Sequence, residues 1–117
     1  MVTAYSGNLK ISMGTKYNLS IMPRAATDLD SIFTYISNEL SSPKASQNLM
    51  SKIEKSFMRL RDMPESCPLC QDEILFAKGY RKLVVNSYIA LYTVNQETRA
   101  VIVMRVFYGR QYNASYL

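Results

Sequence analysis

Histidine and tryptophan are absent from this sequence of 117 residues, and cysteine occurs only twice. Without histidine, the chain lacks the usual general base near neutral pH and the commonest metal ligand. The two cysteines, Cys67 and Cys70, stand in the stretch SCPLC, and one C-x2-C pair supplies only half of a structural zinc site. We therefore expect no metal and no cofactor, and we interpret Cys67 and Cys70 as small residues of a proline-containing loop. A redox pair is the alternative, although no βαβ pattern surrounds the motif.

Long apolar runs are also missing. No stretch approaches the roughly 20 consecutive apolar residues that cross a bilayer, and the first residues, MVTAYSGNLKISMGTK, lack the apolar core of a signal peptide. Hydrophobic residues nevertheless make up 48% of the chain, which is enough for the core of one domain. We expect a cytoplasmic protein without membrane contact, with a flexible tail over residues 1–16 and a single domain over residues 17–117.

Acidic residues are scarce in the C-terminal part of the chain. Residues 1–73 hold eight basic and eight acidic residues, so their charges cancel. Residues 74–117 contain one acidic residue, Glu97, and the six basic residues Lys78, Arg81, Lys82, Arg99, Arg105 and Arg110. This part therefore carries the whole net charge of +5. Such an asymmetry indicates an anionic partner, a nucleic acid or an acidic protein segment, although many small basic domains bind no nucleic acid.

The first half of the chain shows a strand pattern and then two helix patterns. KYNLSIM alternates apolar and polar residues, which predicts a strand ended by Pro23. Apolar residues then recur at three- and four-residue steps, which predicts an amphipathic helix. Its stripe consists of Ala25, Leu29, Ile32, Phe33, Ile36 and Leu40. Ser42 and Pro43 suit the N-cap and first position of another helix, and the short break predicts an antiparallel pair.

The second helix has an apolar stripe and a basic face. The stripe consists of Leu49, Ile53, Phe57 and Leu60. The basic residues Lys52, Lys55, Arg59 and Arg61 are expected to form a mostly solvated face. The two stripes together predict a helix hairpin that packs on one face of a sheet.

Helical spacing disappears after the loop DMPESCPLCQDE. The stretches ILFAKG, YRKLVVN, YIALYTV and RAVIVMRVFYG are rich in β-branched and aromatic residues, which predicts strands. NSYI predicts a tight link between two strands, and NQET predicts a hairpin loop between the last two. The expected fold is α+β, with an N-terminal strand, an antiparallel helix hairpin and then a three- to four-stranded antiparallel sheet.

Alternation along the last strand assigns its residues to two faces. The side expected to face the helices holds Ile102, Met104, Val106 and Tyr108. The opposite, open side is expected to hold Arg99, Val101, Val103, Arg105 and Phe107. Tyr108 should then lie mainly in the core, and Arg105 should emerge from the open face. A snorkelling Arg105 that pairs with a carboxylate is the alternative.

Three stretches of the sequence resemble one known family. IMPRAATDLDSIFTYISNEL is similar to its first helix, with a strand-ending proline and the spacing A..DL..I..YI. KIEKSFMRLRDMPES is similar to its second helix, and GYRKLVVNSYIALYTVNQETRAVIVMRVFYGRQ is similar to its three-strand core. By these stretches the chain resembles the RelE/ParE superfamily of bacterial toxins from type II toxin–antitoxin modules, in a match that spans about residues 17–117. The resemblance implies a cognate antitoxin, growth arrest and a role in plasmid stabilisation.

The resemblance leaves two targets open. ParE-like toxins inhibit DNA gyrase without catalysis, whereas RelE-like toxins cleave mRNA on the ribosome. Cleavage of RNA by its own 2′-OH needs a base, stabilisation of phosphate charge and an acid, so without histidine the candidates are Arg, Lys, Tyr and acidic residues. For a RelE-like nuclease, the resemblance implies Arg110, Tyr116 and Lys82 as catalytic residues. A further arginine of those nucleases is replaced here by Ile89.

A ParE-like inhibitor of gyrase agrees better with the pattern YR.L.V..Y...Y and the terminal leucine. For that function, the target-binding residues implied are Arg81, Arg105, Arg110 and Tyr112. A RelE-like ribosome-dependent mRNA endoribonuclease is the alternative, so the choice between inhibitor and enzyme stays open. A third hypothesis is a non-toxic module that binds only an antitoxin or a nucleic acid. The expected partners are the antitoxin and either gyrase or the ribosome with its mRNA.

Overall fold

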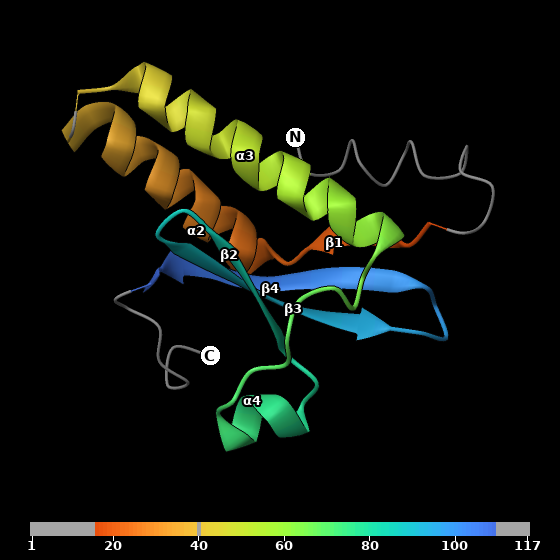
Figure 1. The fold of residues 1–117 in the computed structure, drawn as a ribbon. Coiled ribbons are helices and arrows are strands. Elements are labelled where there is room, and N and C mark those ends of the chain that lie inside the picture. The colour runs from red at the N-terminus through yellow and green to blue at the C-terminus, as the bar shows by residue number, and fades with distance from the viewer. Residues whose placement is uncertain (1–15, 40, 110–117) are drawn as a thin grey trace.

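The computed structural model describes residues 16–39 and 41–109, and its fold is α+β (Figure 1). In chain order the elements are β1 (Asn18–Ile21), α2 (Pro23–Thr34), the π-helical turn η2 (Tyr35–Glu39), α3 (Pro43–Asp62), α4 (Glu73–Ala77), β2 (Arg81–Val85), β3 (Tyr88–Asn95) and β4 (Ala100–Tyr108). The predicted fold class is confirmed. Among these residues, no helix is both long and apolar enough to cross a bilayer. The expected tail, apart from Lys16, lies outside the described residues, as do Arg110, Tyr112 and Tyr116.

The four strands form one sheet in the order β1-β4-β3-β2. The last three strands pair antiparallel, as expected. β1 pairs parallel with β4, from Asn18 opposite Ala100 to Ile21 opposite Val103, so the sheet is mixed. The parallel pairing is possible because the connection between these strands is long and includes the helix pair.

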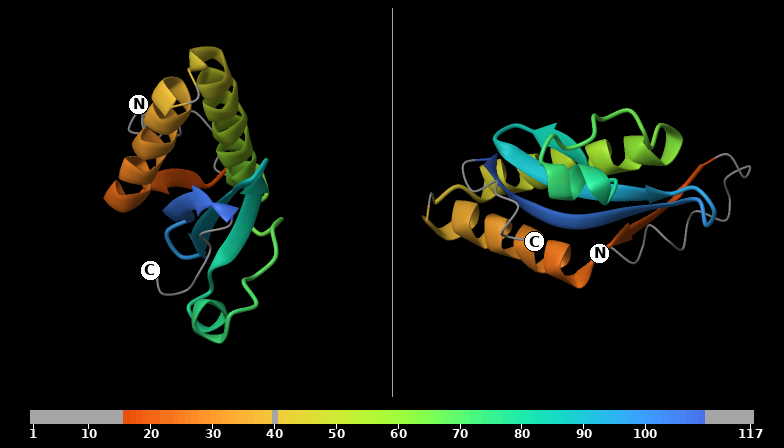
Figure 2. Two further views of the ribbon diagram at one scale, coloured as in Figure 1. Left: turned by 90° about the vertical axis from the view of Figure 1, so that its left-hand side faces the viewer. Right: turned by 90° about the horizontal axis from the view of Figure 1, so that it is seen from below.

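Helices α2 and α3 cover one face of the sheet, and α4 lies on the opposite side (Figures 1 and 2). The Ser42 hydroxyl accepts a hydrogen bond from the Ala45 N–H at 3.3 Å, and Pro43 opens α3, as predicted. The four residues of the α3 stripe are all buried in the core between the helices and the sheet. Phe33 is an exception in the α2 stripe, because its side chain is 39% exposed.

The solvated face of α3 was expected to include Arg61, and this is wrong. Arg61 is only 6% exposed. The last turn of α3 lies against the start of β1, where the Tyr17 N–H donates to the Arg61 carbonyl at 2.8 Å. This packing buries a residue that the helical pattern alone places in solvent.

A β-bulge changes which residues of β4 face the helices. Leu91 of β3 pairs with Arg105 and Tyr92 pairs with Val103, so Met104 is an extra residue in β4. An extra residue reverses the alternation of side chains along a strand. The expected face is therefore correct for Val106, but it is wrong for the first half of the strand. There Val101 and Val103, rather than Ile102, are fully buried on the helix side.

Tyr108 was expected in the core, and this is also wrong. Its side chain is 39% exposed. Its ring packs edge-to-face against Tyr88, with 5.6 Å between the ring centroids. The residue therefore lies at the margin of the core, at the end of β4.

The other face of the sheet is partly covered rather than open. ILFA was expected to begin a strand, but it forms most of α4. The reason is a local N-cap, because Asp72 Oδ1 accepts hydrogen bonds from the N–H groups of Ile74 and Leu75 at 2.9 and 3.2 Å. Leu75 then packs into a second apolar cluster. Its buried members are Cys70, Leu75, Ile89, Leu91 and Phe107.

Candidate functional site

The predicted basic site residues that the structure describes, Arg81, Lys82 and Arg105, are divided between the two faces of the sheet. Lys82 pairs with Leu91, and Leu91 pairs with Arg105, so these three residues form one row across β2, β3 and β4. Directly opposite residues point to the same face, so Lys82 and Arg105 flank Leu91 on the face that carries the second cluster. Arg81 precedes Lys82 in the strand and therefore lies on the helix side. The structure thus brings Lys82 near Arg105 and separates Arg81 from both.

Arg81 fastens the loop before α4 to the sheet. Its Nη1 donates to the carbonyl of Cys67 at 2.6 Å and to that of Glu65 at 3.4 Å, and its Nη2 lies 3.8 Å from a Glu65 carboxylate oxygen. The backbone continues this attachment, because the Lys82 N–H donates to the Pro68 carbonyl and the Cys70 N–H donates to the Tyr80 carbonyl. Arg81 therefore has a structural role at this edge of the sheet.

The two cysteines of this loop face different parts of the core. Cys67 packs against the core on the helix side, whereas Cys70 is 1% exposed within the second cluster. Their divergence is typical of an extended segment, in agreement with the antiparallel bridge between Leu69 and Arg81. In the part of the chain that the structure describes, no group of three or more His, Cys, Asp or Glu residues could hold a metal ion.

Arg105 forms an ion pair with Asp28 of α2. Its Nε donates to Asp28 Oδ2 at 2.8 Å and its Nη2 donates to Oδ1 at 3.1 Å. Each side chain is 16% exposed. The hydrogen bond to Asp28 raises the pKa of Arg105, against the opposing effect of burial. Arg105 thus lies on the expected face, beside the ring of Phe107, but its guanidinium turns to α2 rather than to solvent.

Sequence reasoning did not single out Asp28. The residue adjoins Leu29 of the apolar stripe, within the DL pair of the family-like motif. An acidic residue at the border of a buried stripe is the only signal that could have indicated a buried partner. Its partner, Arg105, lies 77 positions away in the sequence.

Tyr92 is the largest fully buried side chain in the described part of the chain. Its hydroxyl donates a hydrogen bond to the Pro64 carbonyl at 2.8 Å. Burial raises the pKa of Tyr92, and a hydrogen bond with the Cys67 side chain raises it further. Tyr92 therefore holds the same loop that Arg81 holds, from inside the core.

Tyr92→Phe is expected to lower the free energy of unfolding at pH 7 by about 1 kcal/mol, because the Pro64 carbonyl loses its donor. A raised pKa means that the phenol stabilises the fold fully below about pH 10 and loses this effect as the pH rises towards the folded-state pKa. Urea denaturation between pH 7 and 11 should therefore show a smaller alkaline loss in the variant. Tyr35→Phe, at a residue 54% exposed, is the control. Equal alkaline losses in wild type and Tyr92→Phe would contradict this role.

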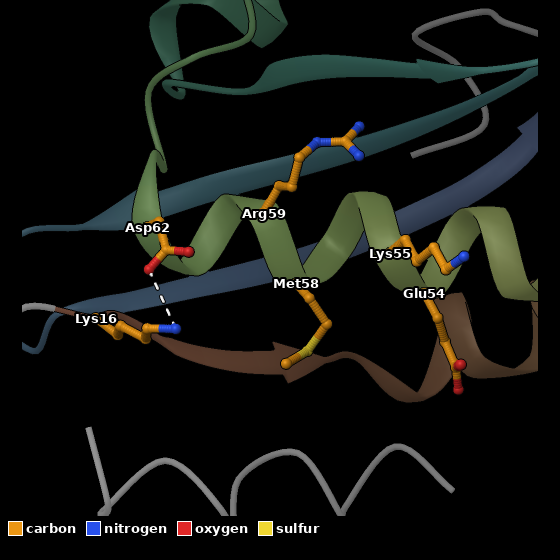
Figure 3. Close-up of a pocket in the computed structure, with 6 residues that line it drawn as sticks. All are labelled: Lys16, Glu54, Lys55, Met58, Arg59 and Asp62. Atoms are coloured by element: carbon orange, nitrogen blue, oxygen red, sulfur yellow. Dashed lines mark ion pairs between the residues drawn. The ribbon is translucent and has the colours of Figure 1, made fainter.

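A hollow on the outer side of α3 has a volume of about 410 Å³ (Figure 3). It is lined by Lys16, Glu54, Lys55, Met58, Arg59 and Asp62. Its charges are of both signs, and Lys16 and Asp62 neutralise each other in an ion pair of 3.4 Å. Of the predicted site residues that the structure describes, Arg81, Lys82 and Arg105, none lines this hollow, so it is not the candidate site.

The geometry agrees with one family of known proteins. The family model described as the ParE toxin of type II toxin-antitoxin system, parDE, matches residues 19–112. Among solved structures, the chromosomal ParDE TA system from P. aeruginosa is similar, with a TM-score of 0.65 and 18% identity over 81% of this chain and 98% of that chain. The toxin-antitoxin complex RelBE2 from Mycobacterium tuberculosis has a TM-score of 0.57 and 19% identity over 80% and 98%. No curated protein matches. At these identities, the two structures show a shared fold.

Proposed function

We propose that this chain, which belongs to the ParE toxin family of type II toxin–antitoxin systems, inhibits DNA gyrase and does not cleave RNA. The family match extends over most of the domain, and the similar solved structures are named as toxin–antitoxin systems. A cognate antitoxin is accordingly the partner that we propose, and the cytoplasm, where gyrase acts on DNA, is the proposed site of action.

Ile89 is the observation that carries the choice of gyrase. The resemblance to RelE-like nucleases would require an arginine at this position. Ile89 is instead 8% exposed and packs in the second cluster with Leu91 and Phe107. An arginine in this apolar cluster would bury a charge, at a large cost in free energy. The surroundings of Ile89 are therefore suited to packing and not to phosphate chemistry.

The internal contacts of Arg81 and Arg105 support the same choice. Both guanidinium groups bind acceptors within the domain, which leaves them poorly placed to stabilise the charge of a cleaving phosphate. Of the four target-binding residues that the resemblance implies, we propose Arg110 and Tyr112 as the direct contacts. Both follow β4 in the sequence and lie outside the described residues.

Purified protein is expected to inhibit the supercoiling of relaxed plasmid DNA by gyrase and to leave ribosome-bound mRNA intact. Arg110→Ala should weaken the inhibition while the melting temperature stays nearly unchanged. The two assays, run on the same preparation, separate an inhibitor from an enzyme. Breaks in mRNA at the ribosomal A site that disappear in Arg110→Ala would instead establish a RelE-like nuclease.

A further inference from the structure

The two edges of β4 have different neighbours along its length. β3 pairs with β4 from Ala100 to Tyr108. On the other edge, the pairing with β1 ends at Val103, where the Met22 N–H donates to the Val103 carbonyl at 2.9 Å. The chain then turns away into α2. Within residues 16–39 and 41–109, the last five residues of β4 therefore have a strand neighbour on one side only.

The Asp28 carboxylate occupies the edge that β1 leaves. Its Oδ2 accepts a hydrogen bond from the backbone N–H of Val106 at 2.9 Å, besides the bond from Arg105 Nε. A side chain of α2 thus accepts a backbone hydrogen bond that a strand would otherwise accept. The same carboxylate holds the guanidinium of the preceding residue by two bonds, which fixes the side chain as well as the backbone.

The end of β4 is also held on its other edge. The Gly109 N–H donates to the Ser87 carbonyl at 2.7 Å. A Cβ atom at Gly109 would lie only 3.1 Å from that carbonyl oxygen, so this close approach favours glycine. Asp28 on one edge and Ser87 on the other therefore hold both edges of β4 at its end, up to Gly109.

We propose that Asp28 is a positioning residue of the toxin, which holds the end of β4 through Val106 and Arg105 in the geometry that growth arrest requires. Arg105 then acts through Asp28 and does not contact the target itself. The inference rests on one part of the proposed function, that the chain acts as a toxin, and does not require gyrase as the target. Growth arrest is its readout, so a failure of the gyrase assay would leave this test interpretable.

The test is a double-mutant cycle on growth arrest, measured as the inducer concentration that halves the growth rate at matched levels of soluble protein. Asp28→Ala and Arg105→Ala should each raise that concentration by about tenfold, the effect of losing one charge-assisted contact. The double variant should need no more inducer than either single variant, because the two substitutions remove the same interaction. If the two effects multiply, Arg105 has a role of its own at the target and the proposal is wrong.

A second readout separates positioning from general stability. In the folded protein, Asp28→Ala should accelerate amide hydrogen exchange at Val106 and Gly109 and leave exchange at Leu83, in the β2–β3 pair, unchanged. Ile53→Val, a core variant on α3, serves as the stability control, and it should keep full toxicity at a similar loss of melting temperature. Unchanged exchange at Val106, or an equal loss of toxicity in the control, would overturn the proposal.

Discussion

Phe57→Ala is expected to lower the free energy of unfolding by about 3–5 kcal/mol, as truncation of a buried aromatic side chain does. Phe57 is 2% exposed, in the core between α3 and the sheet. The domain has one main core, so a cavity at this position removes a large part of a typical total stability of about 5–15 kcal/mol. Urea denaturation monitored by circular dichroism at pH 7 measures the change.

Tyr108→Ala is the matched comparison, because it also removes an aromatic ring. Its side chain is 39% exposed and packs mainly against Tyr88, so the expected loss is about 1 kcal/mol. The alternation of residues along β4 would instead place Tyr108 in the core and predict a loss as large as that of Phe57→Ala. Equal losses in the two variants would favour a buried Tyr108 over the exposed position at the end of β4.

Expression of the chain alone is expected to stop the growth of a bacterial host, and coexpression of its cognate antitoxin is expected to restore growth. The reason is membership of the ParE toxin family together with an intact fold. Colony counts after induction measure the effect, with soluble protein quantified in the same cells. Phe57→Ala gives the first control, since a strongly destabilised chain should arrest growth less than the wild type.

Glu54→Gln gives the second control for growth arrest. Glu54 lines the hollow at α3 and belongs to none of the contacts that hold the end of β4 (Figure 3). The variant should stop growth as strongly as the wild type. Normal growth at a confirmed high level of soluble wild-type protein would show that the chain is a non-toxic binding module.

Much of the positive charge of the C-terminal part is used for contacts inside the folded domain. Among the described residues of this part, three arginines bind partners inside the domain: Arg81 at the loop, Arg105 at Asp28, and Arg99, whose guanidinium carbon lies 4.7 Å from the centre of the Tyr17 ring. Composition alone assigns all six charges to an anionic partner. The internal contacts of these arginines stabilise the fold instead. Fewer of the positive charges are therefore presented to a target or an antitoxin.

Local chemistry determined the two long helices and the turns from the sequence alone. Ser42 and Pro43 mark the start of α3, and the apolar stripe of α3 is buried as its spacing predicts. The tight link at NSYI is a two-residue connection between Val85 and Tyr88, with Asn86 at φ 53°. Each of these features depends on residues within a few positions of one another, so the sequence carries the full information for them.

At α4 the sequence contained a local helix signal, but the strand-like composition of the residues after it pointed the other way. Asp72 is a suitable N-cap, yet the next residues, ILFA, have the composition of a strand. The helix has five residues, too few to establish a helical period. This segment forms a helix through the Asp72 cap together with the burial of Leu75 against the sheet, and only the folded chain shows that burial.

Tertiary structure alone decided the features that concern function most. The parallel pairing of β1 with β4, the bulge at Met104 and the ion pair between Asp28 and Arg105 all join segments that are far apart in the sequence or depend on such pairing. Alternation along β4 predicts side-chain direction only for a regular strand, and a single extra residue reverses it. The sequence left open whether Arg105 emerges into solvent or pairs with a carboxylate, and the structure shows the pair because α2 brings Asp28 to the edge that β1 leaves.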